Sequence, residues 1–279
     1  MKIRVIDFTS KNAPAEFTAG LREIGFAVIS NHTIPHALIN QTYKVWYEFF
    51  KSSEKYNFTF DRKTHDGFIS TALSETAKGY DIKDIKEMYH YYLHGRCPES
   101  CREVSQQLFE SLTDMASTLL SWIEDNSPAD VKAKFSIPLS DMIKNSHHTM
   151  LRLIHYPPLT GNEPEGSIRA AAHEDINLIT LLPAATASGL QVKDAQGNWL
   201  DVPINPEWII VNIADMLQEC SGFYYPSTSH RVLNPVGEAA KQSRLSMPLF
   251  LHPREDVVLS DRYTAKSYRM ERLAELGLK

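Results

Sequence analysis

Hydrophobic residues in the first half of the chain recur mainly at helical spacing. In the longest such stretch Leu108, Leu112 and Leu119 share one helix face, and an Asn-Ser-Pro sequence then ends the helix. Short apolar stretches between the helices are rich in the β-branched and aromatic residues typical of strands. The expected helices cover residues 14–24, 35–51, 98–126 and 129–135, and the expected strands cover residues 3–8 and 26–29.

After His148 the pattern changes to short strands separated by turn residues. Asp194-Ala-Gln-Gly-Asn198 has the composition of a hairpin turn. A series of short strands with such turns favours a closed or sandwiched β core. Residues 57–95 have weak periodicity, which predicts loops with short strands, and a final helix is expected over 268–276. The expected strands of the second half cover residues 150–156, 176–182, 190–194, 198–202, 208–213, 230–234 and 245–251.

The composition is that of an ordinary folded protein. The 279 residues are 43% hydrophobic and 23% charged, enough for one large domain or for a core domain with a substantial N-terminal region. The net charge of −5 gives no indication of a nucleic-acid surface. No apolar run reaches the ~18 residues of a transmembrane helix, and the first residues lack the apolar stretch of a signal peptide. We therefore expect a cytoplasmic protein that binds neither nucleic acid nor a membrane.

The three cysteines do not form a recognisable disulfide or zinc pattern. Cys97 and Cys101 are four positions apart and could lie close together on the first turn of a helix. No second pair of cysteines or histidines completes a zinc site with them. We expect free thiols in a reducing compartment, Cys220 included.

The pattern most informative about chemistry is His173-Glu174-Asp175, followed by His230. In a strand, side chains two positions apart share a face, so His173 and Asp175 can bind one metal while Glu174 points away. His230 begins another expected strand and can supply a third ligand. Two neutral imidazoles and one carboxylate leave about three positions open on Fe(II), enough for a chelating cosubstrate and dioxygen. The sequence therefore predicts an iron enzyme whose metal ligands and catalytic centre are His173, Asp175 and His230.

Arg244 and Ser246 show the same spacing on another expected strand. A guanidinium group binds a carboxylate through two parallel hydrogen bonds, and a serine hydroxyl on the same face can add a third. The simpler alternative for Arg244 is a surface ion pair. Because an unpaired arginine on an apolar strand would be costly, a bound carboxylate is the more natural partner. We therefore expect a site for a keto acid beside the iron.

These residues belong to a longer ordered pattern that resembles the Fe(II)- and 2-oxoglutarate-dependent oxygenases, specifically their isopenicillin N synthase-like branch. The resemblance extends over nearly the whole chain, which makes it far more specific than a lone His-x-Asp. The matching segments are Val5-Ile-Asp7, Gly25-Phe26, Asn31-His32, Ile34-Pro35, Asp84-Ile-Lys-Glu87, Leu151–Pro157, His173-x-Asp175, Leu178–Leu182, Gly189–Val192, Trp199, Val211-Asn212, Asp215, His230-Arg-Val232, Arg244-x-Ser246 and Phe250–Pro253.

The resemblance implies a mixed α and β fold. Its core would be a double-stranded β-helix, a jelly-roll or cupin-like barrel, backed by helices and preceded by an α/β N-terminal region. Residues 1–146 would form the N-terminal region of the non-haem dioxygenase type. Residues 147–279 would form the oxygenase domain, with a C-terminal helix.

The resemblance also implies the cofactors and their ligands. Fe(II), the cosubstrate 2-oxoglutarate and dioxygen would be used, with Arg244 and Ser246 binding the distal carboxylate of 2-oxoglutarate. Tyr156 is a further cosubstrate-binding candidate, because the family has an Asn-Tyr-Tyr-Pro strand where this chain has Ile-His-Tyr-Pro. The tyrosine is kept and the asparagine is replaced. A tyrosine that only packs in the core is the alternative.

The expected activity couples decarboxylation of 2-oxoglutarate to oxidation, in particular hydroxylation, of a small-molecule substrate. One alternative is an oxidase like isopenicillin N synthase, which uses Fe(II) and dioxygen without 2-oxoglutarate. A second is a catalytically silent binding or sensing module, although such a module has no need of open iron positions. Candidate substrate contacts are Tyr89, His90, Arg152 and Phe223, and for each of them a structural role is the favoured alternative.

Overall fold

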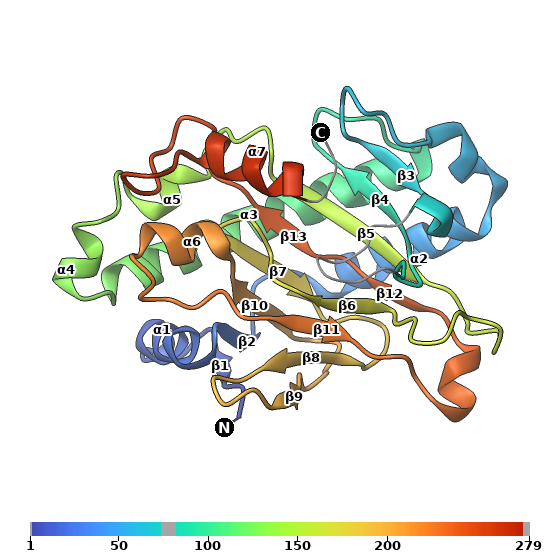
Figure 1. The fold of residues 1–279 in the computed structure, drawn as a ribbon, viewed down its shortest axis with the longest axis horizontal. Helices are drawn as coiled ribbons and strands as arrows, with labels where there is room; N and C mark the ends of the chain where they lie inside the picture. Colours follow the sequence, from blue (N-terminus) through green and yellow to red (C-terminus); the bar gives the residue numbers. More distant parts are fainter. Residues whose placement is uncertain (1, 74–81, 276–279) are drawn as a thin grey trace.

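Two β-sheets face each other and enclose a hydrophobic interior in the computed structural model, which describes residues 2–73 and 82–275 (Figure 1). The larger sheet has the order β1-β2-β10-β7-β13-β5-β4-β3, with β12 beside β5, and the smaller has the order β6-β11-β8-β9. The strands of the larger sheet are β1 (Val5–Asp7), β2 (Phe26–Ser30), β3 (Gly67–Ile69), β4 (Glu87–Tyr91), β5 (Met150–Tyr156), β7 (Ile179–Pro183), β10 (Ile209–Ile213), β12 (Arg244–Ser246) and β13 (Leu249–Leu251). The strands of the smaller sheet are β6 (Ala170–His173), β8 (Leu190–Lys193), β9 (Trp199–Asp201) and β11 (His230–Val232). This is the expected double-stranded β-helix, confirmed by solved structures of the same fold.

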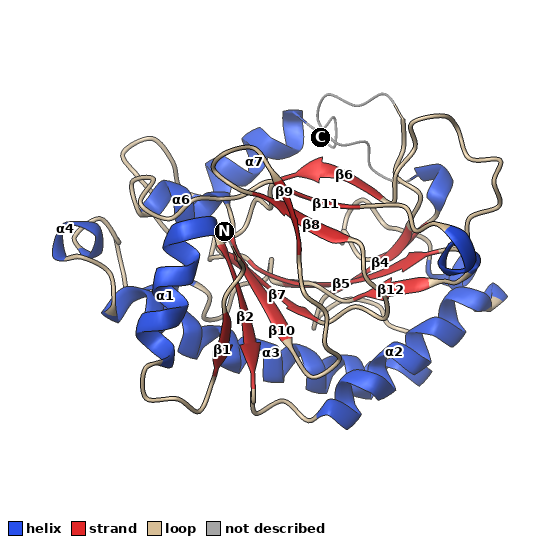
Figure 2. Ribbon diagram, turned by 90° about the horizontal axis from the view of Figure 1, so that it is seen from below, coloured by secondary structure: helices blue, strands red, loops and turns tan. Residues whose placement is uncertain are grey.

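The helices lie mainly against the outer face of the larger sheet. Figure 2 shows α2 and α3 beneath this sheet and the smaller sheet on its opposite side. Within the described ranges the α-helices are α1 (Ala13–Ile24), α2 (His36–Lys51), α3 (Glu99–Asp125), α4 (Ala129–Lys132), α5 (Leu139–Met142), α6 (Asp215–Cys220) and α7 (Ala265–Glu275), and the 3₁₀-helices are η1 (Ser53–Phe58), η2 (Thr71–Leu73) and η3 (Gly237–Lys241).

The larger sheet separates two hydrophobic clusters. The outer cluster lies between the sheet and the helices, where Leu112 and Leu119 of α3 are fully buried. In the same cluster Trp46 of α2 donates a hydrogen bond from Nε1 to Ser105 Oγ at 2.8 Å. The inner cluster fills the barrel between the two sheets and includes Val28 and Ile210. Side chains that alternate along each strand therefore contribute either to the helix side or to the barrel interior.

The helix α1 ends where the sequence predicts, at Gly25. This residue has φ 72°, and its N–H donates to Leu21 O, which closes the helix. A Cβ atom here would lie 2.5 Å from Pro226 O. Glycine is therefore required both by the left-handed backbone and by the close approach of a neighbouring segment.

Several elements differ from the sequence-based expectation. The expected strand over 245–251 is two strands, because Pro248 lacks an N–H and interrupts the pairing. The expected strand over 176–182 begins only at Ile179, the strand expected to carry both His173 and Asp175 ends at His173 as β6, and α6 was not expected. Short strands and loops occur between 57 and 95 as expected, but residues 74–81 lie outside the described part, as does the end of the last helix at Leu276.

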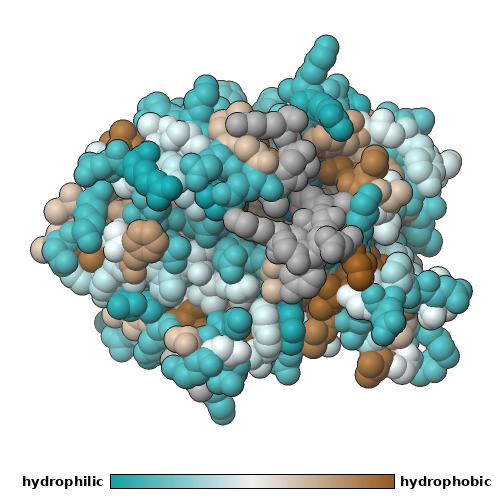
Figure 3. Space-filling model, viewed as in Figure 1, coloured by the Kyte–Doolittle hydropathy of each residue, from teal (hydrophilic) through white to brown (hydrophobic). Residues whose placement is uncertain are grey.

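The described helices do not include one with both the length and the apolar character needed to cross a bilayer. Figure 3 shows a mainly hydrophilic surface on one face, with hydrophobic residues in separate groups. Cys97, Cys101 and Cys220 are buried free thiols, in agreement with the expectation for unpaired cysteines.

We predict that Leu119→Ala lowers the free energy of unfolding by about 2–5 kcal/mol, because it leaves a cavity in the core between α3 and the larger sheet. Urea denaturation followed by circular dichroism measures this loss. Gln107→Ala, at an exposed position of the same helix, is the matched control and should change stability by less than about 0.5 kcal/mol. Equal losses in the two variants would contradict the assignment of this core.

Candidate metal centre

His173, Asp175 and His230 come together inside the barrel. His173 and His230 are directly paired between β6 and β11, and their ring centroids are 4.4 Å apart. The Oδ1 atom of Asp175 lies 4.0 Å from His173 Nε2 and 3.7 Å from His230 Nε2. One ligand atom from each of the three residues lies within 4.8 Å of the others. The sequence-predicted metal ligands are thus neighbours in space.

The path by which Asp175 reaches the site differs from the expected one. The strand β6 ends at His173, so Asp175 lies beyond it rather than two positions along the same strand. Its carboxylate is held by the larger sheet: Oδ2 accepts hydrogen bonds from Thr180 Oγ1 at 2.6 Å and from Asn212 Nδ2 at 2.8 Å. Strands β7 and β10 therefore orient the carboxylate that the smaller sheet alone would leave mobile.

Backbone carbonyls fix the orientation of both imidazole rings. His173 Nδ1 lies 2.8 Å from Ala171 O, and His230 Nδ1 lies 3.2 Å from Thr228 O. Each Nδ1 can only donate to a carbonyl, so Nε2 is left as the basic nitrogen in the neutral ring. Both Nε2 atoms face Asp175, which is the arrangement that metal binding requires. Two imidazole nitrogens and one carboxylate oxygen are a donor set that fits Fe(II) with open positions.

The surroundings keep His173 and Asp175 in their metal-binding protonation states. The pKa of His173 is lowered to about 4, mainly by burial and then by the nearby His230, which together outweigh the opposing effect of Asp175. Burial alone would raise the pKa of Asp175, but the two imidazoles and the hydrogen bonds from Thr180 and Asn212 outweigh it and lower that pKa. Neutral His173 and ionised Asp175 are therefore favoured near neutral pH.

Arg244 and Ser246 lie on β12 and are buried, with 2% and 4% of their surfaces exposed. Arg244 pairs directly with Tyr156 of β5, and its guanidinium carbon lies 5.0 Å from the centre of the tyrosine ring. Its Nε donates to Ala187 O at 2.9 Å. Among the residues that the structure describes, its Nη1 has no hydrogen-bond partner. These features fit an arginine that binds an external carboxylate.

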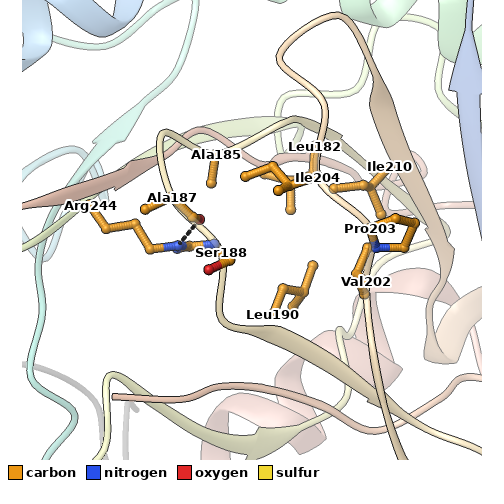
Figure 4. A pocket seen from close by; sticks show the side chains of 10 residues that line it. All are labelled: Leu182, Ala185, Ala187, Ser188, Leu190, Val202, Pro203, Ile204, Ile210 and Arg244. Carbon is orange, nitrogen blue, oxygen red and sulfur yellow. Dashed lines mark hydrogen bonds between the residues drawn. The ribbon is translucent and has the colours of Figure 1, made fainter. Parts of the chain in front are cut away.

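A small pocket lies beside Arg244 at one end of the barrel (Figure 4). Its polar side is formed by Arg244 and Ser188, and the remaining walls are mainly apolar. An apolar wall next to a guanidinium group suits a ligand with methylene groups and a terminal carboxylate. The apolar residues that line the pocket are Leu182, Ala185, Ala187, Leu190, Val202, Pro203, Ile204 and Ile210.

Of the four candidate substrate contacts, Tyr89 lies on the helix side of the larger sheet and Phe223 is largely exposed. Tyr89 is fully buried in the outer cluster, where its hydroxyl donates to Arg96 O. Phe223 is 67% exposed. His90 and Arg152 are paired between β4 and β5, and the guanidinium of Arg152 lies 5.1 Å from the ring of Phe250. Phe250 is in turn paired with Thr180, whose hydroxyl donates a hydrogen bond to Asp175. Arg152 and Phe250 therefore form a wall of the barrel that adjoins the Asp175 carboxylate.

Three buried residues at or near the site were given no role from the sequence. Thr180 and Asn212 are polar residues inside apolar strands, and this is a signal that could have indicated their contact with a buried carboxylate. Arg169 is 1% exposed and immediately precedes β6. Arg169 is a single cationic residue before an alanine-rich segment, and nothing in that sequence indicated that it would be buried.

Comparisons with known proteins agree with the geometry. Residues 147–253 match the sequence profile of the 2OG-Fe(II) oxygenase superfamily. Residues 3–112 match the N-terminal region of the non-haem dioxygenases of morphine synthesis. The chain is also 27% identical to jasmonate-induced oxygenase 3 of Arabidopsis thaliana, over 87% of this chain and 67% of that protein.

Solved structures extend the likeness over the full chain. A Shewanella oneidensis protein assigned as an oxygenase is 54% identical, with 100% of both chains covered and a TM-score of 0.91. A Neurospora crassa protein crystallised with α-ketoglutarate and thymine has a TM-score of 0.79 at 20% identity, over 98% of this chain and 96% of that chain. At 20% identity, the similarity to the Neurospora crassa protein shows a shared fold and no more.

With its barrel, its His-Asp-His cluster and these matches, the chain belongs to the 2OG-Fe(II) oxygenase superfamily. The protein is a non-haem iron dioxygenase that uses Fe(II), 2-oxoglutarate and dioxygen.

We predict that Thr180→Val lowers Fe(II) affinity about 10–100-fold, because Asp175 loses the hydroxyl that orients its carboxylate. Anaerobic titration with Fe(II) against a competing chelator measures the affinity. Thr113→Val is the control, since that hydroxyl only donates to Phe109 O within α3. Unchanged affinity in Thr180→Val would show that the hydrogen bond does not position the ligand.

Proposed function

We propose that His173, Asp175 and His230 are the three protein ligands of the catalytic Fe(II). The observation that carries this proposal is the convergence of their ligand atoms within 4.8 Å, with both Nε2 atoms directed to the carboxylate. When bound, the iron supplies the redox chemistry that activates dioxygen. The role of the protein is to hold the three ligands in one orientation and to leave the other side of the metal open.

We further propose that Arg244 and Ser246 bind the distal carboxylate of 2-oxoglutarate. Both side chains are buried and share one face of β12, and the pocket next to Arg244 has apolar walls. A carboxylate there would satisfy the guanidinium and would be shielded from water, which strengthens the interaction. Tyr156, paired with Arg244, supports the cosubstrate either through its hydroxyl or by packing against the guanidinium.

The proposed reaction is hydroxylation of a small molecule bound against Arg152 and Phe250. This wall adjoins Asp175 through Thr180, so a substrate there would lie beside the metal. Relatives that bind thymine or jasmonate-type ligands support the small-molecule class. A cytoplasmic protein without nucleic-acid or membrane partners remains our prediction from composition and charge.

We also propose that the chain divides into an N-terminal region, residues 1–146, and an oxygenase domain, residues 147–279. The two separate profile matches, over 3–112 and 147–253, support this division. The strands β1 and β2 nevertheless extend the same sheet as β10, so the two regions would share one hydrophobic core.

We predict that His173→Ala and Asp175→Ala abolish 2-oxoglutarate-dependent succinate formation, because two ligands do not hold the metal in a catalytic geometry. Succinate release in a metabolite screen measures the activity. Glu174→Gln lies between the two ligands in the sequence and should retain activity. Full turnover in His173→Ala would remove this residue from the metal site.

We predict that Arg244→Met raises the KM for 2-oxoglutarate about 10–100-fold, with a smaller change in kcat, since it removes charge-assisted hydrogen bonds to the cosubstrate. Steady-state kinetics with varied 2-oxoglutarate measure both constants. Oxygen consumption that needs Fe(II) and substrate but no 2-oxoglutarate would instead indicate an oxidase of the isopenicillin N synthase type.

A further inference from the structure

A second buried arginine, Arg169, lies over the same tyrosine ring as the arginine expected to bind the cosubstrate. Arg169 precedes β6 in the smaller sheet, whereas Arg244 is on β12 in the larger sheet. They are 1% and 2% exposed. Their guanidinium carbons lie 5.8 Å and 5.0 Å from the ring centre of the same residue, Tyr156. Two cations from opposite sheets therefore meet at one tyrosine.

The protein satisfies the hydrogen-bonding groups of these two arginines only in part. Arg169 donates from Nη2 to Gln242 O at 3.1 Å, and Arg244 donates from Nε to Ala187 O at 2.9 Å. Arg169 Nε and Arg244 Nη1 find no acceptor among residues 2–73 and 82–275. Neutral carbonyls do not neutralise a buried cation, so two like charges are enclosed at a substantial cost in free energy.

Another buried cation, Lys86, is paired with an acidic side chain of the protein. Lys86, 6% exposed, forms an ion pair with Asp84 at 2.8 Å, and Asp84 also accepts a hydrogen bond from Ala171 N at the edge of β6. The chain thus places a carboxylate beside a buried cation with a structural role. Within the described part of the chain, neither Arg169 nor Arg244 forms an ion pair with an acidic side chain, so both charges are available to an acidic ligand.

We propose that Arg169 is a second anchor for the distal carboxylate of the keto-acid cosubstrate, so that this carboxylate is bound by arginines from both sheets. This inference rests on the proposed function of Arg244. A carboxylate has about four lone pairs, enough to accept hydrogen bonds from both guanidinium groups. Burial lowers the pKa of Arg169, and the charge of Arg244 adds to the effect, as expected for two cations that lack an anion.

The proposal predicts a specific preference for dicarboxylic keto acids. 2-Oxoglutarate and 2-oxopentanoate share the keto acid end and chain length, but only the first has a distal carboxylate. Calorimetric titration of each into the anaerobic Fe(II) protein gives the ratio of their dissociation constants. Arg169→Met and Arg169→Gln should each reduce the preference for 2-oxoglutarate about tenfold or more, while binding of 2-oxopentanoate changes little.

The two variants and a control separate the proposal from a structural role. Arg169→Gln keeps a donor for Gln242 O and so provides a test even if Arg169→Met fails to fold. Arg231 is another arginine of the smaller sheet, and its guanidinium carbon lies 4.0 Å from the ring centre of Trp199. Arg231→Met should leave the preference for 2-oxoglutarate over 2-oxopentanoate unchanged. If either folded Arg169 variant weakens both ligands equally, or neither, Arg169 does not contact the distal carboxylate.

Failure of this inference differs from failure of the proposed function. If wild-type protein prefers 2-oxoglutarate and loses the preference in Arg244→Met but not in the Arg169 variants, only the role of Arg169 is wrong. If wild-type protein binds both keto acids equally, the cosubstrate site itself is wrong. A second readout is the Tm without cosubstrate, which Arg169→Gln should not lower, because it removes a buried charge adjacent to another.

Discussion

The structure depends on one buried carboxylate shared by the two sheets. Asp175 is 7% exposed, lies between two imidazoles, and accepts hydrogen bonds from Thr180 and Asn212 of the larger sheet. The two histidines come from the smaller sheet, so the centre forms only when the sheets close on each other. A buried charge without these partners would be strongly destabilising. Closure of the barrel and formation of the metal site are therefore linked.

The distribution of buried charge supports the proposed binding of an anionic cosubstrate inside the barrel. The pair of Lys86 and Asp84 is neutral within the protein, whereas Arg169 and Arg244 bring two positive charges to Tyr156. A ligand that supplies the missing negative charge binds the folded state alone and therefore stabilises it. In this view the cosubstrate completes the electrostatics of the barrel as well as taking part in the reaction.

The long helices were predicted from local patterns, and the structure brings together the three candidate ligands that the sequence singled out. The stripe of Leu108, Leu112 and Leu119 specifies α3, and the ordered His-x-Asp and His residues specify the metal-binding groups. The sequence did not predict the bounds of β6, because an alanine-rich segment has low strand propensity and is held by its pairing with β11. The pairing of β6 with β11 is irregular, and such pairing depends on the tertiary structure rather than on the local sequence.

Side-chain direction was the other limit of the sequence. Tyr89 and His90 are adjacent on β4 and must face opposite sides of the sheet. Which side is the barrel interior depends on where the helices pack, so Tyr89 was wrongly included among the substrate contacts. Arg169 was missed for a related reason, since its contact with Tyr156 joins the two sheets and has no spacing rule along the chain.

The central claim is that residues from the facing strands β6 and β11, together with Asp175, bind one ferrous ion. A crystal structure of the anaerobic protein with Fe(II) and 2-oxoglutarate tests it most directly. We expect anomalous density for one iron bound to Nε2 of His173, Nε2 of His230 and a carboxylate oxygen of Asp175, with the distal carboxylate of the cosubstrate at Arg244. Iron at another position, or iron at this position without His230 among its ligands, would contradict the account.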